Sequence, residues 1–398
     1  MIKNKIINIR KYFSKYKIDG YIVPKNDEFF SEYAENDRLK IMTNFSGSAG
    51  FSIILKNKNF LFVDGRYTIQ AKQQSGKYFS IIEVHKYLPY LVLKKYKKIS
   101  LGFDPKLFTS NSLKFYFKNN LHLKPIKENL VDKIVKIKRT LNLKSFYSIN
   151  DQVVGESTVS KINKISNYLK MIKSDNLFIS APENAAWTLN IRGKDNPYSP
   201  IPNCQMVITK KKQIYLIVNK KKIKNISKKI KLHNIKIIDP SKFINLIKNL
   251  KGKKFIIDRL SCSVFNEHLI LSKFQIKNFQ DPCYSFKSIK NSSEIENMIK
   301  AHIMDGVALT KFIYWMKNKN SKIITEIAAQ NKLEKFRKLN KKYLFPSFNT
   351  IAGTGSNGAI IHYKATKISN KKINKNDIFL CDSGGQYKFG TTDVTRTI

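Results

Sequence analysis

The sequence has few cysteines, few arginines and no long apolar run, and each scarcity argues against a class of protein. Its four cysteines are far apart in 398 residues and form no CxxC pair, which argues against a zinc cluster and a disulfide framework. No stretch approaches the roughly 20 apolar residues of a membrane helix, so we expect no membrane partner. The N-terminus has charges but no continuous apolar core, so we predict no secretory signal and expect a cytoplasmic protein.

Acidic residues are also scarce, since 28 Asp and Glu accompany 74 Lys and Arg, for a formal net charge of +46. Such a balance is typical of nucleic-acid binding. Only eight of these basic residues are Arg, however, and phosphate and base recognition usually recruits the planar fork of arginine. The lysines are spread along the whole chain beside many Asn and Ile, as AT-rich codons would produce. We therefore expect solvated lysine faces and no nucleic-acid partner, and a polyanion binder remains the third hypothesis.

The predicted elements fall into two blocks that match in kind and order, which indicates two tandem α/β domains. Each block begins with a helix, continues with a short buried strand and then has a β hairpin across a polar turn. In the first block the strand and hairpin are predicted at Tyr21–Pro24, Phe51–Leu55 and Phe60–Val63. In the second block the helix, strand and hairpin are predicted at residues 161–172, Leu177–Ile179, Gln205–Ile208 and Gln213–Val218.

A third block begins with a helix start signal. Ser293 and Glu296 have the spacing of a capping box, and apolar residues follow at helical spacing, namely Ile295, Met298, Ile299, Ile303 and Val307. After it we predict a second helix at 323–337, a glycine-rich loop at Gly353–Gly355, and strands at Ile360–Ile361 and Ile378–Cys381. We expect domains at 1–138, 139–288 and 289–398. The chain stops within a β segment, so we expect the third domain to be incomplete.

The densest candidate site is the hairpin that carries Asp382 and Asp393. A turn centred between Tyr387 and Lys388 would place these two carboxylates opposite one another, although a bulge or a one-residue shift would leave only their proximity. Opposed carboxylates repel and need a cation, a shared proton or a basic partner. With nitrogen ligands added, such oxygens suit Mn, Co or Zn. Two isolated aspartates are more often turn or edge residues.

A second candidate is His362, which follows a predicted strand end and the glycine-rich loop. A histidine there could donate a proton or bind a carbonyl oxygen at a metal site. Taken alone, it is more often a strand-end histidine with an ordinary hydrogen bond. The other five histidines lack this context.

These residues stand in the motifs NGAIIHY and DSGGQY…GTTDVTRT, with which the sequence resembles aminopeptidase P. This is the Xaa-Pro aminopeptidase branch of the creatinase and methionine aminopeptidase superfamily. The resemblance covers nearly the whole chain and extends to Tyr21–Pro24, Phe45–Gly50, Asp64–Tyr67, Asn184–Gly193, Pro197–Pro200 and Glu294–Trp315. It implies two creatinase-like N-terminal α/β domains, as in the three-domain type, and an incomplete pita-bread catalytic domain.

The resemblance also implies roles for four residues. Asp382 and Asp393 match two of five metal ligands, and Asp393 would bridge two divalent ions while Asp382 would bind one. His362 matches a histidine that contacts the peptide and assists the reaction, and Arg66 matches an arginine that reaches the bound peptide. The ions are expected to be Mn²⁺, with Zn²⁺ or Co²⁺ as alternatives. The remaining ligands, one His and two Glu, would lie beyond Ile398.

The activity implied is release of the N-terminal residue from peptides with proline in the second position. The resemblance implies a homodimer for the full-length protein and an inactive chain for the residues given. Phe389 stands where the family usually has Asp, and Ser356 where it often has Pro, and we expect modest local effects at both. The alternative hypothesis is a non-catalytic pita-bread protein that binds peptides.

Overall fold

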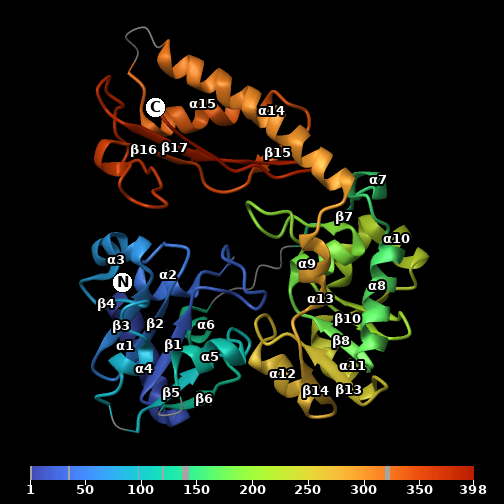
Figure 1. Ribbon diagram of the computed structural model, residues 1–398. Helices are drawn as coiled ribbons and strands as arrows, with labels where there is room; N and C mark the ends of the chain where they lie inside the picture. Colours follow the sequence, from blue (N-terminus) through green and yellow to red (C-terminus); the bar gives the residue numbers. More distant parts are fainter. Residues whose placement is uncertain (1, 35, 97, 119–120, 137–142, 319–322) are drawn as a thin grey trace. The chain divides into compact units, whose positions relative to one another are not determined.

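The computed structural model describes residues 2–34, 36–96, 98–118, 121–136, 143–318 and 323–398. The chain divides into two compact units (Figure 1). The first comprises Met1–Ser148, Val159–Gly193 and Ile201–Lys287, and the second Ile149–Thr158, Lys194–Pro200 and Ser288–Ile398. The predicted boundary between residues 138 and 139 lies outside the described residues.

The elements of the first unit are two sets of strands with their helices. The first set of strands is β1 (Gly20–Pro24), β2 (Phe51–Leu55), β3 (Asn59–Val63), β4 (Ser80–Glu83), β5 (Ser100–Phe103) and β6 (His122–Pro125). Its helices are α1 (Ile2–Tyr16), α2 (Arg38–Thr43), η1 (Gly65–Tyr67), α3 (Thr68–Ser75), α4 (Pro89–Val92), α5 (Ser110–Tyr116) and α6 (Leu130–Val135). The second set of strands is β8 (Asn176–Ile179), β10 (Gln205–Thr209), β11 (Ile214–Ile217), β12 (Lys236–Ile238), β13 (Lys254–Ile257) and β14 (Gln275–Asn278), with a short pair β7 (Tyr147–Ser148) and β9 (Ile191–Arg192). Its helices are α8 (Thr158–Met171), α9 (Pro182–Leu189), η2 (Lys220–Ile226), α10 (Ser227–Leu232), η3 (Pro240–Lys242), α11 (Phe243–Asn249), α12 (Val264–Leu271) and α13 (Pro282–Ser288).

The two sheets of the first unit have the same topology. Their strand orders are β4-β3-β2-β1-β5-β6 and β12-β11-β10-β8-β13-β14. In each sheet three neighbouring strands are joined by two antiparallel pairings, and every other pairing is parallel. This shared order confirms the prediction of two tandem α/β domains of the same kind.

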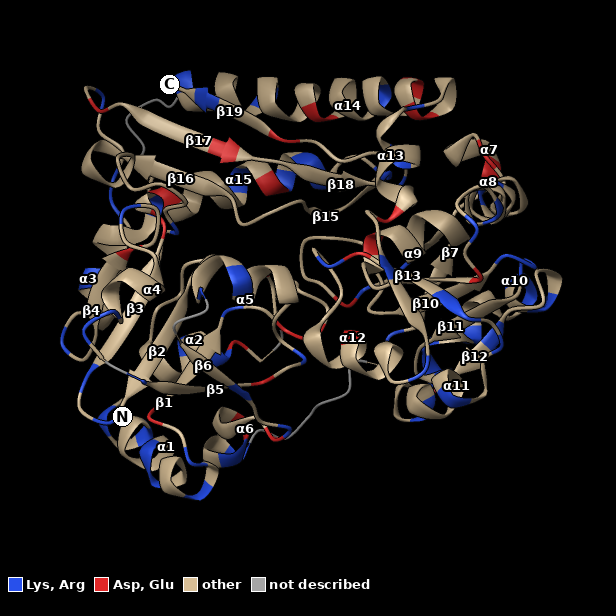
Figure 2. Cartoon of the chain, turned by 60° about the horizontal axis from the view of Figure 1, so that its bottom comes forward, with Lys and Arg blue, Asp and Glu red and all other residues tan. Residues whose placement is uncertain are grey.

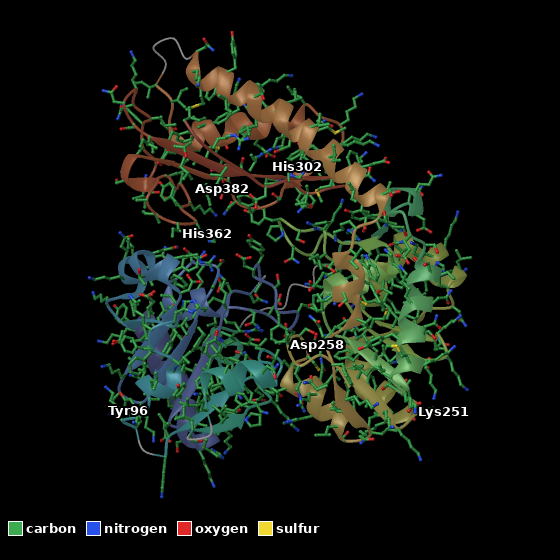
Figure 3. All side chains as sticks on the ribbon, in the orientation of Figure 1. Tyr96, Lys251, Asp258, His302, His362 and Asp382 are labelled. Atoms are coloured by element: carbon green, nitrogen blue, oxygen red, sulfur yellow. The ribbon has the colours of Figure 1, made fainter. Side chains whose placement is uncertain are left out.

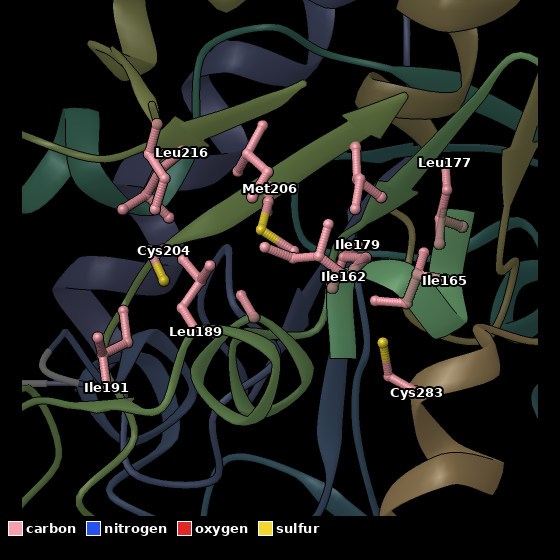
Figure 4. Packing of buried hydrophobic residues seen from close by; sticks show 14 of the residues in the cluster. Ile162, Ile165, Leu177, Ile179, Leu189, Ile191, Cys204, Met206, Leu216 and Cys283 are labelled. Atoms are coloured by element: carbon pink, nitrogen blue, oxygen red, sulfur yellow. The ribbon is translucent and has the colours of Figure 1, made fainter. Parts of the chain in front are cut away.

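Apolar periodicity explains the cores of both domains. In α1 the buried residues are Ile2, Ile6, Ile9 and Phe13, one stripe of a helix that packs on its sheet. In the second domain Ile162 and Ile165 of α8 pack against strand residues such as Met206 (Figure 4). The predicted strands of both hairpins are confirmed to within one residue at each end, because each is a β-rich run bounded by a polar turn.

The second unit contains two long helices and two small sheets. Its elements are α7 (Asp151–Val154), α14 (Ser292–Lys317), α15 (Glu326–Lys338), β15 (Tyr343–Pro346), β16 (Ile351–Thr354), η4 (Gly355–Asn357), β17 (Phe379–Ser383), β18 (Gly385–Tyr387) and β19 (Val394–Thr397). The sheets have the orders β16-β17-β19 and β15-β18, so the chain passes from one sheet to the other at Gly384. A Cβ atom at Gly384 would lie 2.0 Å from the Thr392 carbonyl oxygen and 2.2 Å from Ser347 Oγ. Only glycine fits this crossing.

The start and the buried face of α14 differ from the prediction. The capping box uses Asn291 and Glu294, because the Asn291 side chain accepts from the Glu294 N–H and the Glu294 carboxylate accepts from the Asn291 N–H. The apolar residues at helical spacing are 40–62% exposed, namely Ile295, Met298, Ile299, Ile303 and Val307. The buried face consists of Ala301, Asp305, Ala308, Leu309, Phe312 and Met316.

Two further predictions in this unit need correction. Ile360 and Ile361 lie in a turn and not in a strand, since the Ile360 N–H donates to the Asn357 carbonyl and the Tyr363 N–H to the Ile360 carbonyl. Gly353 belongs to β16, so the strand extends into the predicted glycine-rich loop. The second helix begins at Glu326, three residues later than predicted, because Thr325 caps it.

A buried ion pair joins the two long helices to the strands. Arg337 of α15 donates from Nε and Nη2 to the two carboxylate oxygens of Asp305 of α14, at 2.7 and 3.0 Å. Their side chains are 1% and 3% exposed. Arg337 Nη2 also donates to Ser383 Oγ at 3.0 Å, and the Tyr387 hydroxyl donates to Asp305 at 2.9 Å. The pair therefore ties both helices to β17 and β18.

The basic residues are distributed over the whole of both units (Figure 2). Figure 2 shows Lys and Arg scattered over helices and strands of both units, as the even spread of lysine along the sequence predicts. All four cysteines are buried and free of disulfides. Within the described residues no helix is long and apolar enough to cross a membrane.

We expect Arg337→Met to lower the free energy of unfolding of the second unit by about 3–5 kcal/mol, because it leaves the Asp305 carboxylate buried and unpaired. Urea unfolding would be followed by Trp315 fluorescence in a Trp187→Phe background, which removes the other tryptophan. The matched control is Lys338→Met on the same helix, where an exposed pair with Glu334 should contribute at most about 1 kcal/mol. Equal losses in the two variants would contradict the role of the buried pair.

Candidate active site

The predicted hairpin exists, but its register differs from the predicted one. Asp382 of β17 pairs with Thr395 of β19 and not with Asp393, and the Thr395 hydroxyl donates to the Asp382 carboxylate at 2.8 Å. The Tyr387 N–H donates to the Gly390 carbonyl at 2.8 Å. The turn is therefore centred between Lys388 and Phe389, one residue later than predicted, which moves each cross-strand partner by two residues.

The shift by two keeps both carboxylates on one face of the hairpin, since strand side chains alternate with a period of two. Asp393 is a diagonal neighbour of Asp382, and such neighbours lie roughly 7–8 Å apart in an antiparallel pair. Partial desolvation, and then the negative charge of Asp382, raise the pKa of Asp393 above its usual value. The predicted proximity is therefore present, whereas the direct opposition that a turn between Tyr387 and Lys388 would have given is not.

The face that carries the carboxylates points away from the helices. Phe379, Cys381 and Ser383 of β17 are buried, and the first two pack in the core with α14 and α15, whereas Asp382 is half-buried on the opposite face. Asp393 is exposed. Figure 3 shows Asp382 on this sheet and His302 on α14. The sheet thus uses one face for packing and the other for polar groups open to ligands.

The two carboxylates suit a divalent cation, because a positive charge between them would offset the repulsion of two neighbouring negative charges. They are only part of a ligand set. Among the described residues no group of three or more His, Cys, Asp or Glu is arranged to hold a metal ion.

His362 lies in the turn after η4, in the same unit (Figure 3). Its φ angle is +55°, in the left-handed region, which histidine, like Asn and Asp, adopts more often than most other residues with a side chain. The side chain is exposed. An exposed histidine held in this backbone conformation is suited to contact a ligand and not to fill a core.

A buried carboxylate that the sequence analysis missed holds this turn. Glu326 is fully buried at the start of α15 and accepts from the side chains of Asn357 and Tyr363, at 2.9 Å from each. It also accepts from the N–H groups of Thr354 and Lys371, at 2.9 and 3.1 Å. Asn357 and Tyr363 are the two ends of the NGAIIHY motif. The motif thus closes on Glu326, which in the sequence is only one acidic residue in the first turn of a helix.

Arg66 belongs to the first unit and lies in η1, directly after β3. Its Nε and Nη2 donate to the Asp64 carboxylate at 3.0 and 2.7 Å, and this pairing lowers the pKa of Asp64. The Arg66 side chain remains 45% exposed. The Asp64–Tyr67 motif thus orients a solvent-accessible guanidinium.

The two positions that depart from the family pattern are both accommodated. Phe389 lies in the hairpin turn and packs against the cluster of Ala301, Tyr343 and Tyr387. Ser356 lies in η4, where its hydroxyl accepts from Lys371. Neither side chain displaces Asp382 or Asp393.

Comparison with known proteins identifies all three blocks. Family models of the Creatinase/Prolidase N-terminal domain match residues 5–134 and 138–294, and that of metallopeptidase family M24 matches residues 296–398. A Xaa-Pro aminopeptidase 1 of Dictyostelium discoideum is 30% identical over 424 residues, covering 100% of this chain and 67% of the relative. A probable Xaa-Pro aminopeptidase P of Laccaria bicolor is 29% identical, covering 99% of this chain and 64% of the relative. The chain thus spans about two thirds of the length of such relatives.

A solved structure agrees with these matches. The X-prolyl aminopeptidase of Caenorhabditis elegans, described as a cytosolic enzyme with a di-nuclear active site, has a TM-score of 0.92 and 26% identity. The match covers 100% of this chain and 70% of that one. With two creatinase-type domains followed by an M24 domain, the chain belongs to the Xaa-Pro aminopeptidase P family of metallopeptidases.

Proposed function

We propose that the protein is a metal-dependent Xaa-Pro aminopeptidase, which removes the N-terminal residue from peptides with proline in the second position. The observation that carries this proposal is the pair of carboxylates, Asp382 and Asp393, on the open face of one hairpin. Two neighbouring negative charges repel, and a cation between them would stabilise both. Family membership supplies the reaction class.

Asp382 and Asp393 would hold two divalent metal ions together with ligands from the rest of the full-length protein. A di-nuclear site in the Caenorhabditis elegans relative supports this number. We propose Mn²⁺ as the metal, because carboxylate oxygens suit it, with Zn²⁺ or Co²⁺ as alternatives. Bound ions of this kind supply an activated water near neutral pH and polarise a carbonyl oxygen.

The chain's own residues would orient the peptide. We propose that His362 hydrogen-bonds the carbonyl group that precedes proline and moves a proton during cleavage. Its exposure and its fixed backbone support this role. We also propose Arg66 as a peptide-binding residue, because Asp64 holds its guanidinium in a defined direction while leaving it accessible. A planar fork of this kind is suited to peptide carbonyl or carboxylate oxygens.

The proposal also covers the domain bounds, the oligomeric state and the location of the protein. We propose domains at 1–138, 139–288 and 289–398, a homodimer for the full-length protein and a cytoplasmic location. The description of the Caenorhabditis elegans relative as cytosolic supports the location. Sedimentation of the full-length protein would test the dimer.

We expect Asp393→Asn to abolish Mn²⁺ binding and release of the N-terminal residue by the full-length protein, because the neutral amide removes a charged ligand without changing the size of the side chain. Calorimetric titration with Mn²⁺ and an assay on a Xaa-Pro peptide would measure both. The control is Asp239→Asn, which changes a half-buried Asp that caps η3. A wild-type protein that cleaves nothing with any of the three metals would rule out the peptidase. Peptide binding without cleavage would then support the non-catalytic alternative.

We expect His362→Asn to lower kcat by about 10²–10⁴-fold, the usual contribution of a positioned acid–base group. Asparagine tolerates the left-handed backbone at this position, so the turn should persist. Mn²⁺ affinity should stay at the wild-type value. The matched control is His302→Asn, at an exposed histidine whose ring contacts the Met298 carbonyl on α14. If His362→Asn retains wild-type kcat, the histidine has no role in the chemical step.

We expect Arg66→Gln to raise KM about tenfold with little change in kcat, since a charge-assisted contact made equally to substrate and transition state affects binding alone. Steady-state kinetics on Xaa-Pro tripeptides would measure KM and kcat separately. Lys56→Gln is the control, because it removes another exposed ion pair of the same domain, that with Asp19. An unchanged KM in the Arg66 variant would exclude the proposed contact.

A further inference from the structure

One short segment belongs to the second unit, although the sequence on both sides of it belongs to the first. Residues 194–200 follow β9 of the first unit, yet they belong to the second unit. Two hydrogen bonds anchor Tyr198 there. Its hydroxyl donates to Asn349 Oδ1, and its carbonyl oxygen accepts from Gln386 Nε2 at 2.9 Å.

Gln386 connects this segment to both strands of the hairpin. It lies on β18 between the two carboxylates in sequence, and it is only 6% exposed. Its Nε2 donates to the Tyr198 carbonyl. Its Oε1 accepts from the hydroxyl of Thr391, across the hairpin turn, at 2.6 Å. The buried amide of Gln386 on β18 thus bonds both the segment 194–200 and Thr391, which lies on the other side of the hairpin turn.

Asn349 leads to the same hairpin by a second route. It lies in the segment between β15 and β16, where the Ser347 N–H donates to the Gly384 carbonyl at 3.1 Å. Ser347 Oγ donates to the Thr392 carbonyl at 2.8 Å. Gly384 is two residues after Asp382, and Thr392 directly precedes Asp393. The backbone beside each carboxylate is therefore bonded to the segment that Tyr198 contacts.

We propose that Tyr198 and Gln386 are positioning residues of the metal site, and that the segment 194–200 sets the separation of Asp382 and Asp393. This inference rests on the proposed function. Neither side chain is proposed as a metal ligand. Each acts through the hairpin, by restricting the twist between its two strands and so ordering the ligand oxygens before metal binds. Outer hydrogen bonds of this kind typically contribute about 10–100-fold to metal affinity.

The test is Mn²⁺ affinity, measured by titration calorimetry on the full-length protein. Gln386→Leu keeps the size of the side chain but removes both amide hydrogen bonds, and we expect affinity to fall about 10–100-fold. Tyr198→Phe removes the hydroxyl bond to Asn349 but leaves the amide of Gln386 in place, and we expect a smaller loss. The matched control is Tyr314→Phe, which removes a hydroxyl from a side chain that is 70% exposed on α14 of the same unit.

The double variant separates positioning from general weakening. If Tyr198 and Gln386 position the hairpin as one coupled unit, the loss of Mn²⁺ affinity in the double variant will be smaller than the sum of the two single losses. Metal affinity equal to wild type in both variants, with only a lower midpoint of thermal unfolding, would overturn the inference. Should Gln386→Leu fail to fold, the affinity of Tyr198→Phe decides alone. A wild-type protein that binds none of Mn²⁺, Co²⁺ or Zn²⁺ would instead refute the proposed function.

Discussion

The second unit depends on the buried pair of Arg337 and Asp305. Two charges removed from water are tolerated only when their hydrogen bonds are satisfied, and here Ser383 and Tyr387 complete the set. The four residues of this network lie on α14, α15, β17 and β18. The ion pair therefore determines how the hairpin packs on the two helices. Because Ser383 directly follows Asp382, the same pair determines where the candidate ligand strand lies.

The hairpin shows how far sequence reasoning could go. Alternation and motif spacing were sufficient to predict two strands with Asp382 and Asp393 close together, and the family of the chain follows from the same motifs. The direct partner of Asp382 depended on the exact position of the turn, which closes at Lys388 and Phe389, and this partner is Thr395. The carboxylates still share a face, since a register change of two residues preserves the alternation of side chains.

The rest could not be predicted because it depends on contacts between distant residues or on residues whose type carries no signal. Helical periodicity in α14 favoured the isoleucine stripe, yet the helix buries Ala301 and Asp305 and exposes Ile299 and Ile303. Asp305 can face inward only because Arg337, 32 residues away, neutralises it. In the same way, Glu326 gains its role from Asn357 and Tyr363, which no local pattern connects to it.

Both candidate segments are held by buried polar networks. A group that binds metal or peptide must stay open to solvent, so apolar packing around that group itself cannot fix its position. A hydrogen-bonded carboxylate beneath it can, because its bonds have defined directions and are costly to leave unsatisfied. Asp305 accepts a hydrogen bond from the hairpin that carries Asp382, and Glu326 accepts one from the turn that carries His362. Two buried carboxylates outside the motifs, Asp305 and Glu326, thus support the candidate segments, which is why the motifs alone indicate the candidate chemistry but not its support.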